Sequence, residues 1–513
     1  MILDKLRPYQ LSAVEEIVAR RRQLLADQPG LGKTYTALAA CEKDGLFERP
    51  ARILVLARTT GAVLTWIPKC HELLADTNVK VLDITTQSLT RRNILAAAWA
   101  DSDQPVIFIG NHNAIEVAPN GGAKLPALFH IEWDAVIIDE SQWVLPSEAT
   151  ARTLMTQFWR GLVGLQIPPT ALRLCASGTP DRSGKLEYRY GTYKFLLPER
   201  YNGSYDYDMW LHDFFYVSYF KIPVTSRTGK KFQIDGRRVT GVKKPDLWQE
   251  VEKLMMIRRT KAEVAPELPA KQYVDVILPH PVKLRQRYLE FKSEFEAKDD
   301  GSAIAADTFA TRARQFATCD WDVQLLADGS TTATPIVGGE SEKLVWLLDW
   351  LDERGYNDAD SPDTSRVVIA SQYSAVLRWL AEEFALRSIP AEILDGSRST
   401  PQRLSVQRAF QSGTGPRIIL LNMSLGDSID LDAADDLIFC DLVHSPDKTE
   451  QVEDRVHRVS RTHQVTIWRL RSEGTIDMVI ATENAERYDN SRAMMDATRG
   501  VDIERNIMER IVE

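Results

Sequence analysis

Residues 27–34, DQPGLGKT, contain the residue types that bind the phosphates of a nucleotide. They follow a short apolar stretch, residues 24–26, and precede a segment with helical spacing. In such a loop, glycines let backbone N–H groups approach the phosphates, a lysine neutralises the β and γ oxygens, and a threonine hydroxyl ligates Mg²⁺. The general pattern begins with Gly, where this chain has Asp27. The residues expected to contact the nucleotide are Gly30, Leu31, Gly32, Lys33 and Thr34.

Two adjacent carboxylates, Asp139 and Glu140, end the apolar stretch of residues 136–141, VIIDES. Parallel α/β sheets place ligands at the carboxyl ends of their strands, so we expect both carboxylates at the nucleotide. Asp139, together with Thr34, would hold Mg²⁺, and Glu140 would orient and deprotonate the attacking water. Acid pairs are also common in simple turns, but the upstream lysine and threonine favour nucleotide hydrolysis.

Residues 451–461, QVEDRVHRVSR, carry two arginines, Arg455 and Arg458, spaced three apart. In a helix this spacing puts both on one face, where they can reach one phosphate and stabilise the transferring phosphoryl group. Supplied by a second lobe, they would couple hydrolysis to lobe closure. A solvated basic face would show the same pattern. Gln451 is a further candidate nucleotide contact, and His457 is expected to be structural or to face nucleic acid, because no second metal ligand stands at a suitable spacing.

Short β-branched runs recur between amphipathic segments along the chain. Such runs predict buried parallel strands, and the segments between them, such as residues 35–41 and 375–384, predict helices. The β-α pattern occurs twice, which predicts an α/β fold with two doubly wound parallel sheets. The expected strands are residues 52–56, 106–109, 135–138, 172–176, 367–370, 418–421 and 437–439.

The composition of the sequence changes between these repeats, starting with the aromatic-rich residues 186–220. We read such stretches as insertions projecting from the lobes. The expected domains are an N-terminal ATP-binding lobe, residues 1–265, with an inserted region at about 182–250, and a C-terminal lobe, residues 266–513, with a helical insertion at about 282–340. Small and polar residues predict surface loops at residues 328–339 and 355–365.

The composition is that of an ordinary globular protein, with 44% hydrophobic and 26% charged residues among 513. No apolar run reaches the roughly 18 residues of a membrane-spanning helix, and the N-terminus has no hydrophobic signal region. We therefore expect an intracellular protein. No reader module or long basic tail is recognisable, which favours a bacterial or host cytoplasm over a nucleus. Five cysteines without a C-x-x-C pair predict reduced core thiols rather than disulfides or a zinc site.

The net charge of -9 argues against a surface that binds nucleic acid everywhere. Any such binding must be local, and residues 221–244 form the candidate patch, because their eight lysines and arginines face a single acid, Asp235. Lys230 and Lys231 are the candidate contacts within it. A solvated charged loop fits the same residues equally well.

The motifs and their order resemble those of helicase superfamily two, and within it the Swi/Snf-type DNA translocases. Residues 6–10, LRPYQ, are similar to that family's opening motif, which implies that Gln10 contacts adenine, and the family also carries Asp at the position of Asp27. Residues 255–272, MMIRRTKAEVAPELPAKQ, resemble a bridge peculiar to the Swi/Snf branch and argue against a generic RNA helicase. The likeness covers nearly the whole chain. It implies two tandem RecA-like lobes that use ATP and Mg²⁺.

Further stretches resemble the family's nucleic-acid motifs, including ILVLARTT, IFIGNHNAI, SGTP and VVIASQYS. Most of the polar candidates fall at expected strand ends, where they can track phosphates without reading sequence, so we expect salt-sensitive binding. Core packing is the other possibility for the tryptophans at 66, 133 and 143. The contacts that the resemblance implies are Trp66, Asn111, Ser177, Thr179, Ser371 and Gln372.

Two departures from the family pattern concern coupling. Ser141 and Gln142 follow the acid pair where the family usually has Ala and His, so coupling to DNA is expected to differ. In GDSIDLDAAD, Gly426 is followed by Asp427, and Asp430 takes the place of the usual Asn. Hydrolysis itself should survive both changes.

The leading hypothesis is an ATP-dependent motor that moves along duplex DNA without sequence specificity, with RNA a less favoured partner and a monomer sufficient. A strand-separating DNA or RNA helicase is the alternative among enzymes; the sequence shows no obvious separating pin, but a hairpin within the insertions would escape notice. A nucleotide-switched binding protein is the alternative of another class. Two arginines suited to a transferring phosphate argue against such a switch.

Overall fold

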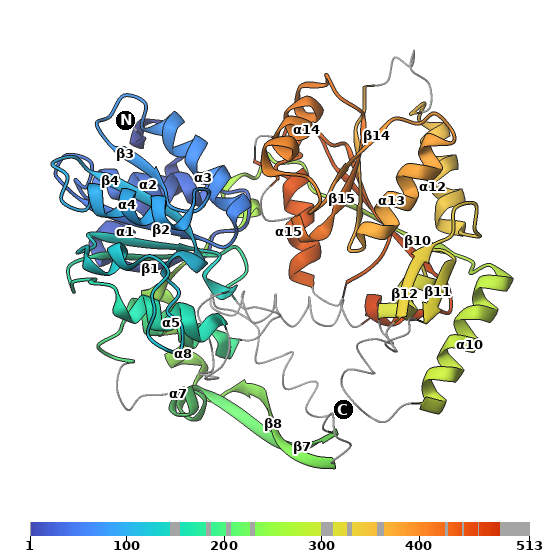
Figure 1. The fold of residues 1–513 in the computed structure, drawn as a ribbon, viewed down its shortest axis with the longest axis horizontal. Helices are drawn as coiled ribbons and strands as arrows, with labels where there is room; N and C mark the ends of the chain where they lie inside the picture. The colour runs from blue at the N-terminus through green and yellow to red at the C-terminus, as the bar shows by residue number, and fades with distance from the viewer. Residues whose placement is uncertain are drawn as a thin grey trace. The chain divides into compact units, whose positions relative to one another are not determined.

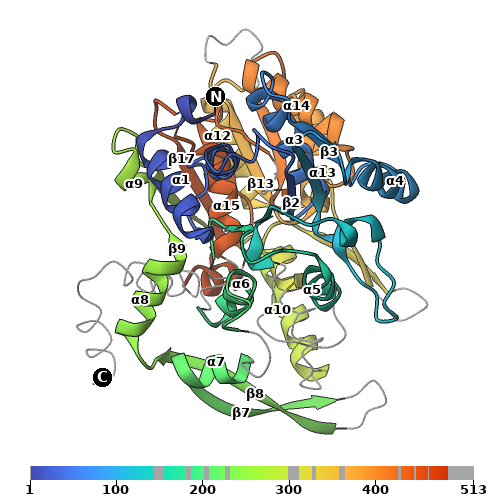
Figure 2. The ribbon, with the colours of Figure 1, turned by 90° about the vertical axis from the view of Figure 1, so that its left-hand side faces the viewer.

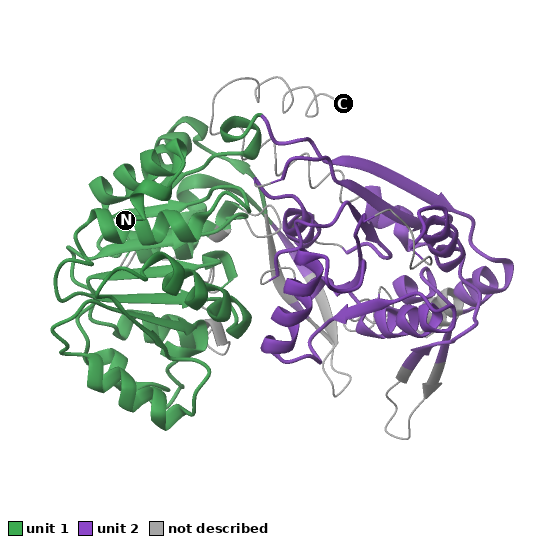
Figure 3. Ribbon diagram, turned by 90° about the horizontal axis from the view of Figure 1, so that it is seen from above, with its two compact units in different colours: residues 1–218, 239–266, 490–513 green, residues 219–238, 267–489 purple. Residues whose placement is uncertain are grey.

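The computed structural model describes residues 2–143, 154–180, 186–201, 207–225, 231–298, 311–325, 331–356, 364–425, 429–443, 446–459 and 461–482. The chain divides into two compact units (Figure 3). Unit 1 includes the described parts of residues 1–218 and 239–266, and unit 2 those of residues 219–238 and 267–489. Each unit contains one large parallel sheet.

Unit 1 is built on a seven-stranded sheet with the order β3-β4-β2-β5-β6-β1-β9. Strands β1 to β4 of this sheet are labelled in Figure 1. All neighbouring strands are parallel. Because β5, β6 and β1 are neighbours running the same way, their carboxyl ends meet at one edge of the sheet. The strands are β1 (Arg22–Leu25), β2 (Arg52–Ala57), β3 (Lys80–Asp83), β4 (Val106–Asn111), β5 (Ala135–Asp139), β6 (Leu172–Ala176) and β9 (Met256–Ile257).

Helices cover both faces of this sheet and form two separate cores. On β2, Leu54 and Leu56 face one core and Ile53 and Val55 face the other, as the alternation of a doubly covered strand requires. The helices are η1 (Leu3–Lys5), α1 (Pro8–Arg20), α2 (Lys33–Lys43), α3 (Thr60–Leu73), α4 (Leu89–Trp99), η2 (His112–Ile115), η3 (Pro126–His130), η4 (Ser141–Trp143), α5 (Leu154–Gly164), η6 (Leu186–Tyr188), α6 (Arg189–Leu196), α7 (Tyr207–Phe214) and α8 (Pro245–Met255).

A two-stranded ribbon separates α7 from α8. It consists of β7 (Phe215–Thr225) and β8 (Lys231–Val242), which pair with each other and with no third described strand. The view in Figure 2 shows this ribbon beside α7 and below α8. The sequence had suggested a basic patch or a solvated loop in this region, so an ordered hairpin is a new finding.

Unit 2 repeats the plan of a parallel sheet with helices on both faces. Its six strands are all parallel and follow the order β10-β17-β16-β13-β15-β14. The strands are β10 (Gln272–Leu278), β13 (Val367–Ser371), β14 (Ala391–Leu394), β15 (Ile418–Asn422), β16 (Asp436–Phe439) and β17 (Thr466–Ser472). The helices of unit 2 are α10 (Val282–Lys298), α12 (Glu342–Glu353), α13 (Ser374–Ala385), α14 (Thr400–Ser412), η7 (Met423–Leu425) and α15 (Pro446–Val456). A short helix, α9 (Lys261–Val264), precedes them at the end of unit 1.

The seven strands predicted from β-branched runs are confirmed, and so is the α/β class with two doubly wound sheets. The loop predicted at 328–339 is wrong in part, because β12 (Thr331–Pro335) pairs there with β11 (Trp321–Leu325) in an antiparallel hairpin. Most of the loop predicted at 355–365 lies outside the described residues. All five cysteines are buried and free, as predicted. Among the described residues, no helix is long and apolar enough to cross a membrane.

Candidate active site

The phosphate loop connects β1 to α2, where the sequence placed it. Gly30 and Gly32 have φ angles of 88° and 78°, which L side chains rarely adopt. A β-carbon on Gly32 would also lie 2.5 Å from the Gln10 amide nitrogen. Lys33 begins α2 and its Nζ donates to the carbonyl of Asp27 at 2.8 Å, so the ammonium group folds back over the loop. Thr34 is partly exposed in the first turn of α2.

Residues 9 and 10 brace the loop from α1. The Tyr9 hydroxyl donates to the carbonyl of Leu31 at 3.0 Å, and Gln10 Nε2 donates to the same carbonyl at 3.2 Å. Gln10 Oε1 accepts from the backbone N–H of Arg7 at 2.9 Å. Both ends of the Gln10 amide therefore have protein partners, so an adenine base would have to share or replace them.

A second brace comes from the residues that follow β9. Arg259 pairs with both oxygens of Asp27, at 2.9 and 2.7 Å, and also donates to the carbonyl of Tyr9. Lys261 N donates to Gln28 Oε1 at 2.7 Å. Asp27 is fully buried, so this pair replaces the hydration that its carboxylate loses. The sequence had singled out residues 255–272 as a family bridge but had not assigned Arg259 to the phosphate loop.

The two carboxylates stand where β5 ends. Asp139 accepts from Trp66 Nε1 at 2.9 Å, and its carbonyl lies 3.2 Å from His112 Nε2. Burial, with help from the charge of Glu140, raises the pKa of Asp139 to about 6. Burial also lowers the pKa of His112 to about 3, so that ring is neutral. Glu140 has a φ of 51°, the strained left-handed conformation that marks many functional turns.

The donor set fits Mg²⁺. Burial and a neighbouring carboxylate both disfavour the charged form of a carboxyl group, and a nearby divalent cation favours that charged form. At nucleotide sites Mg²⁺ is commonly held by one or two protein groups together with substrate phosphates and water. Asp139 and the Thr34 hydroxyl are the groups that would hold it.

Gln142 is one of the two residues after the acid pair at which the chain departs from the family pattern, and there we expected altered coupling to DNA. Its Nε2 donates to Glu140 Oε2 at 2.5 Å and to Thr179 Oγ1 at 3.4 Å. Thr179 belongs to SGTP, residues 177–180, after the neighbouring strand β6. The amide thus links the expected base to the next motif. The space there is tight, because a β-carbon on Gly178 would lie 2.5 Å from Pro29 Cγ.

The expected nucleic-acid contacts of unit 1 are mostly placed inside the protein. Trp66 is buried and donates to Asp139, an environment that matches the core-packing alternative for this residue. The hydroxyl of Ser177 is also buried and accepts from Thr179 N at 3.1 Å. Asn111 is partly exposed, and its Nδ2 donates to Thr60 Oγ1 at 3.2 Å.

In unit 2, Ser371 is the last residue of β13 and Gln372 follows it, at the carboxyl edge of the sheet. Ser371 is buried and donates to Asp441, so its hydroxyl supports the turn and does not face outward as expected. The Gln372 backbone N–H donates to Asp441 at 3.1 Å, and its side chain accepts from Arg314 at 3.2 Å. Both residues therefore belong to a polar network at this edge.

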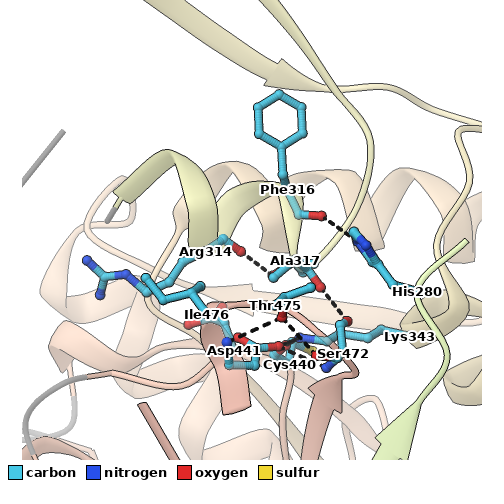
Figure 4. A network of polar contacts seen from close by, with 12 residues as sticks. His280, Arg314, Phe316, Ala317, Lys343, Cys440, Asp441, Ser472, Thr475 and Ile476 are labelled. Atoms are coloured by element: carbon cyan, nitrogen blue, oxygen red, sulfur yellow. Dashed lines mark hydrogen bonds and ion pairs between the residues drawn. The ribbon is translucent and has the colours of Figure 1, made fainter. Parts of the chain in front are cut away.

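That network is centred on a buried ion pair (Figure 4). Lys343 Nζ donates to Asp477 Oδ2 at 2.6 Å and to the carbonyl of Cys440 at 2.8 Å, and both charged side chains are almost fully buried. Ser472 Oγ donates to the carbonyl of Ala317 at 2.6 Å. The contacts tie the ends of β16 and β17 to the segment before β11. They hold the strand ends in a fixed arrangement.

Arg455 and Arg458 meet at one carboxylate. Arg455 Nη1 lies 3.7 Å from Asp430 Oδ1, and Arg458 forms an ion pair with the same oxygen. The expectation that both lie on one helical face is wrong, because α15 ends at Val456. Burial lowers the pKa of Arg458 to about 10, still well above neutrality.

A contact with a distant segment satisfies a carbonyl at the end of α15. The backbone N–H of Leu431 donates to the carbonyl of Arg455 at 3.0 Å, which occupies an acceptor at the end of the helix. His457 is buried and its Nε2 lies 2.8 Å from the carbonyl of Pro269, so its structural assignment holds. Gln451 is also buried, on the same helix. Asp430 was noted only as a departure from the family; its adjacency to both arginines could not be read from their spacing.

Four of the residues named from the sequence give little to compare. Lys230 lies outside the described residues, and Gly426 and Asp427 do too. Lys231 is the first residue of β8.

With this geometry in view, comparison with known families is decisive. The SNF2-related domain matches residues 9–310, and the helicase conserved C-terminal domain matches residues 343–460. The chain belongs to the SNF2-related family. Both matches assign it to the helicase-type ATP hydrolases, as the order of motifs predicted.

Several curated SNF2-type relatives are similar over nearly the whole chain. The ISWI chromatin-remodeling complex ATPase ISW1 of Saccharomyces cerevisiae is 23% identical over 92% of this chain and 39% of its own length. The DNA annealing helicase and endonuclease ZRANB3 of Homo sapiens is 23% identical over 93% of this chain and 39% of its own. The chain thus spans about two fifths of the length of these relatives.

A solved structure, titled the Sulfolobus solfataricus SWI2/SNF2 ATPase core in complex with dsDNA, matches 96% of this chain and 94% of its own at 17% identity, with a TM-score of 0.37. The lobes are assigned as RecA-like from the family matches and from the two parallel sheets, with their strand orders, described above.

Proposed function

We propose that this SNF2-related chain is an ATP-dependent DNA translocase that couples hydrolysis between two lobes to movement along duplex DNA without sequence specificity. The carrying observation is the convergence of Arg455 and Arg458 on one carboxylate oxygen of Asp430. A pair of guanidinium groups that shares one anionic oxygen is suited to share a phosphoryl oxygen. The lobes would be residues 1–265 and 266–513, and a monomer would suffice because both arginines come from the same chain.

The nucleotide would bind at the carboxyl edge of the unit 1 sheet. Backbone N–H groups of Gly30, Leu31 and Gly32 would hold its phosphates, with Gln10 contacting the adenine and Gln451 a further contact from the second lobe. Lys33 would swing from the Asp27 carbonyl to the β and γ oxygens. Bound Mg²⁺, held by Thr34 and Asp139, would supply charge neutralisation at the phosphates.

Glu140 would act as the base. Its carboxylate is held by Gln142 and stands beside Asp139, at the end of β5 where the attacking water would sit. Glu140 Oε2 accepts from the Gln142 amide, and this hydrogen bond fixes the orientation of the carboxylate. Arg455 and Arg458 would leave Asp430 for the phosphoryl group as it departs, which links hydrolysis to the position of the second lobe.

Duplex DNA as the track rests on the family resemblance and on the polar strand ends. Asn111 and Gln372 are the candidates that are partly exposed, Thr179 is buried beside Gln142, and Lys230 and Lys231 add basic charge. Such contacts reach phosphates without reading bases, so binding should weaken steeply with salt.

The test is displacement of a triplex-forming strand from a duplex. A motor that follows the duplex displaces the third strand in an ATP-dependent way without separating the other two. We expect displacement with wild type, none with Glu140→Gln, and less as salt rises. Displacement that ignores ATP, or a chain that releases only strands of a fork, would contradict duplex translocation.

The second candidate, a strand-separating helicase, gains one specific observation in its favour. The β7–β8 ribbon is a hairpin of the kind that the sequence did not reveal. Its consequences for the substrate are considered next. A nucleotide-switched binding protein has no comparable support, because binding alone does not call for two arginines suited to a transferring phosphate.

A further inference from the structure

The β7–β8 ribbon is long for a two-stranded element. β7 has 11 residues and β8 has 12, and a strand rises about 3.3 Å per residue, so each spans roughly 35 Å. A free ribbon of two strands is at best marginally stable in water. Something must therefore fix its base.

An aromatic cluster performs this anchoring. Phe214 and Phe215, where α7 passes into β7, are buried against Trp210 and Trp248, with ring centroids 4.6 Å apart for Phe214 and Trp210 and 5.2 Å apart for Phe215 and Trp248. The backbone N–H of Lys243 donates to the carbonyl of Phe214 at 2.7 Å and closes the ribbon at its base. The ribbon is thus a held element, not a loose loop.

Beyond its base the ribbon exposes aromatic rings that no core uses. Tyr216, Tyr219 and Phe220 are 56%, 74% and 48% exposed. Successive residues of a strand point to opposite faces, so Tyr216 and Phe220 lie on one face and Tyr219 on the other. Three large rings on a short exposed stretch are uncommon on a protein surface without a partner.

The charge of the same segment indicates the class of partner. Residues 221–244 carry eight lysines and arginines against one acid in a chain whose net charge is -9. A basic ribbon complements the phosphates of nucleic acid, and exposed rings stack on bases that are no longer paired. Rings on both faces suit a ribbon that lies between two strands, one base against each face.

We propose that the β7–β8 ribbon binds the junction of a branched DNA, with Tyr219 and Phe220 stacking on the unpaired bases next to the duplex. The chain then binds a fork more tightly than a blunt duplex of the same paired sequence. This inference rests on the proposed function for its biological use, but binding at a junction does not require ATP.

The ribbon is also connected to the nucleotide site through the chain. β8 leads into α8, and α8 leads into β9, whose pairing with β1 precedes the Arg259–Asp27 contact at the phosphate loop. Glu252 on α8 is buried and paired with Arg189, so this helix has a fixed place in unit 1. The ribbon is therefore joined to the phosphate loop by one short stretch of chain.

The experiment measures binding by fluorescence anisotropy without nucleotide. Its probes are a forked duplex with two single-stranded arms and a blunt duplex of the same paired sequence. Removing a stacked ring weakens binding by roughly fivefold or more. We expect the wild-type chain to prefer the fork by about tenfold or more, and the double variant Tyr219→Ala/Phe220→Ala to bind both probes within about twofold of each other.

Three controls make the result specific. Tyr219→Phe keeps a ring and should keep the fork preference. Ile94→Ala removes an exposed apolar side chain from α4, 61% exposed, and should change neither affinity. With 2-aminopurine beside the junction, stacking should quench the emission in wild type and in Tyr219→Phe but not in the double variant.

Equal affinity of the wild-type chain for both probes would overturn the proposal, as would a fork preference that survives in the double variant. The first result would point to a protein as the occupant of the ribbon. Fork preference without any ATP-dependent movement would leave this inference standing and contradict the proposed function, so the two fail separately.

Discussion

Arg259 forms a two-pronged ion pair with Asp27, at 2.9 and 2.7 Å, although the two residues are 232 positions apart. The pair joins the first residue of the phosphate loop to the segment that leaves unit 1. A fully buried carboxylate and a planar guanidinium fix each other's orientation better than a lysine would. The phosphate loop is therefore shaped by residues far from it in the sequence.

Breaking this pair should be costly. Arg259→Ala leaves Asp27 buried without its partner, which typically destabilises a protein by roughly 3–5 kcal/mol. We expect a lower urea midpoint and a raised KM for ATP. Arg49→Ala removes an ion pair whose arginine is about half exposed, so that matched control should lose at most about 1 kcal/mol. Equal losses in the two variants would refute the brace.

Gln142 should affect coupling because it connects Glu140 to Thr179. In Gln142→Ala the base loses a hydrogen bond and the next motif loses its link to the base. We expect the ratio of DNA-stimulated to unstimulated ATPase rate to fall several-fold. Gln142→Glu preserves length but repels Glu140, so it should be at least as damaging. A stimulation ratio equal to that of wild type would show that coupling takes another route.

Asp430 competes with phosphate for the two arginines. Asp430→Asn keeps the side-chain shape but removes the negative charge that Arg455 and Arg458 share. Phosphate then need not displace a carboxylate, and we expect a severalfold lower KM for ATP. The asparagine is also the residue usual at this place in the Swi/Snf-type family. A higher KM would mean that Asp430 positions the arginines for phosphate.

Glu453 predicts how the stability of unit 2 depends on pH. Burial alone would raise the pKa of Glu453. Its two carboxylate oxygens, however, pair with Lys271 Nζ at 3.0 Å and Arg469 Nη2 at 2.9 Å, and these charges hold the pKa below its ordinary value of 4.5. A carboxyl group whose pKa is lower in the folded state than in the unfolded state stabilises the folded state at pH values above the unfolded pKa. That stabilisation is lost as the pH falls through the folded pKa. Glu453→Gln should lose roughly 3 kcal/mol near pH 7. In urea denaturation, the difference in unfolding free energy between wild type and this variant should shrink below pH 4.5. A difference that stays constant with pH would contradict this account.

Local patterns were enough to predict the strands and the phosphate loop. A buried parallel strand is a continuous β-branched run, and the glycine spacing of the loop is set by its own backbone. Contacts between distant segments were not predictable in this way. β9 has two residues, too few for any periodicity, yet its pairing with β1 delivers Arg259 to the loop.

The arginines and the hairpin show the same limit. A spacing of three suggested one helical face, but the contact of Leu431 with the Arg455 carbonyl stands where α15 ends, and Asp430 brings the arginines together instead. For Trp66 the sequence left both a nucleic-acid contact and core packing open, and its burial and its hydrogen bond to Asp139 support core packing. The ribbon was hidden because residues 218–221 of β7 are all exposed, so the strand shows no alternation of buried and exposed residues there.

The most direct test of the central claim is the steady-state ATPase rate with and without duplex DNA, for wild type and Arg458→Ala. We predict strong stimulation of wild type by the duplex and, in the variant, loss of most turnover with nucleotide binding retained. Turnover that ignores duplex DNA, or that survives in Arg458→Ala, would contradict a motor driven by hydrolysis between two lobes.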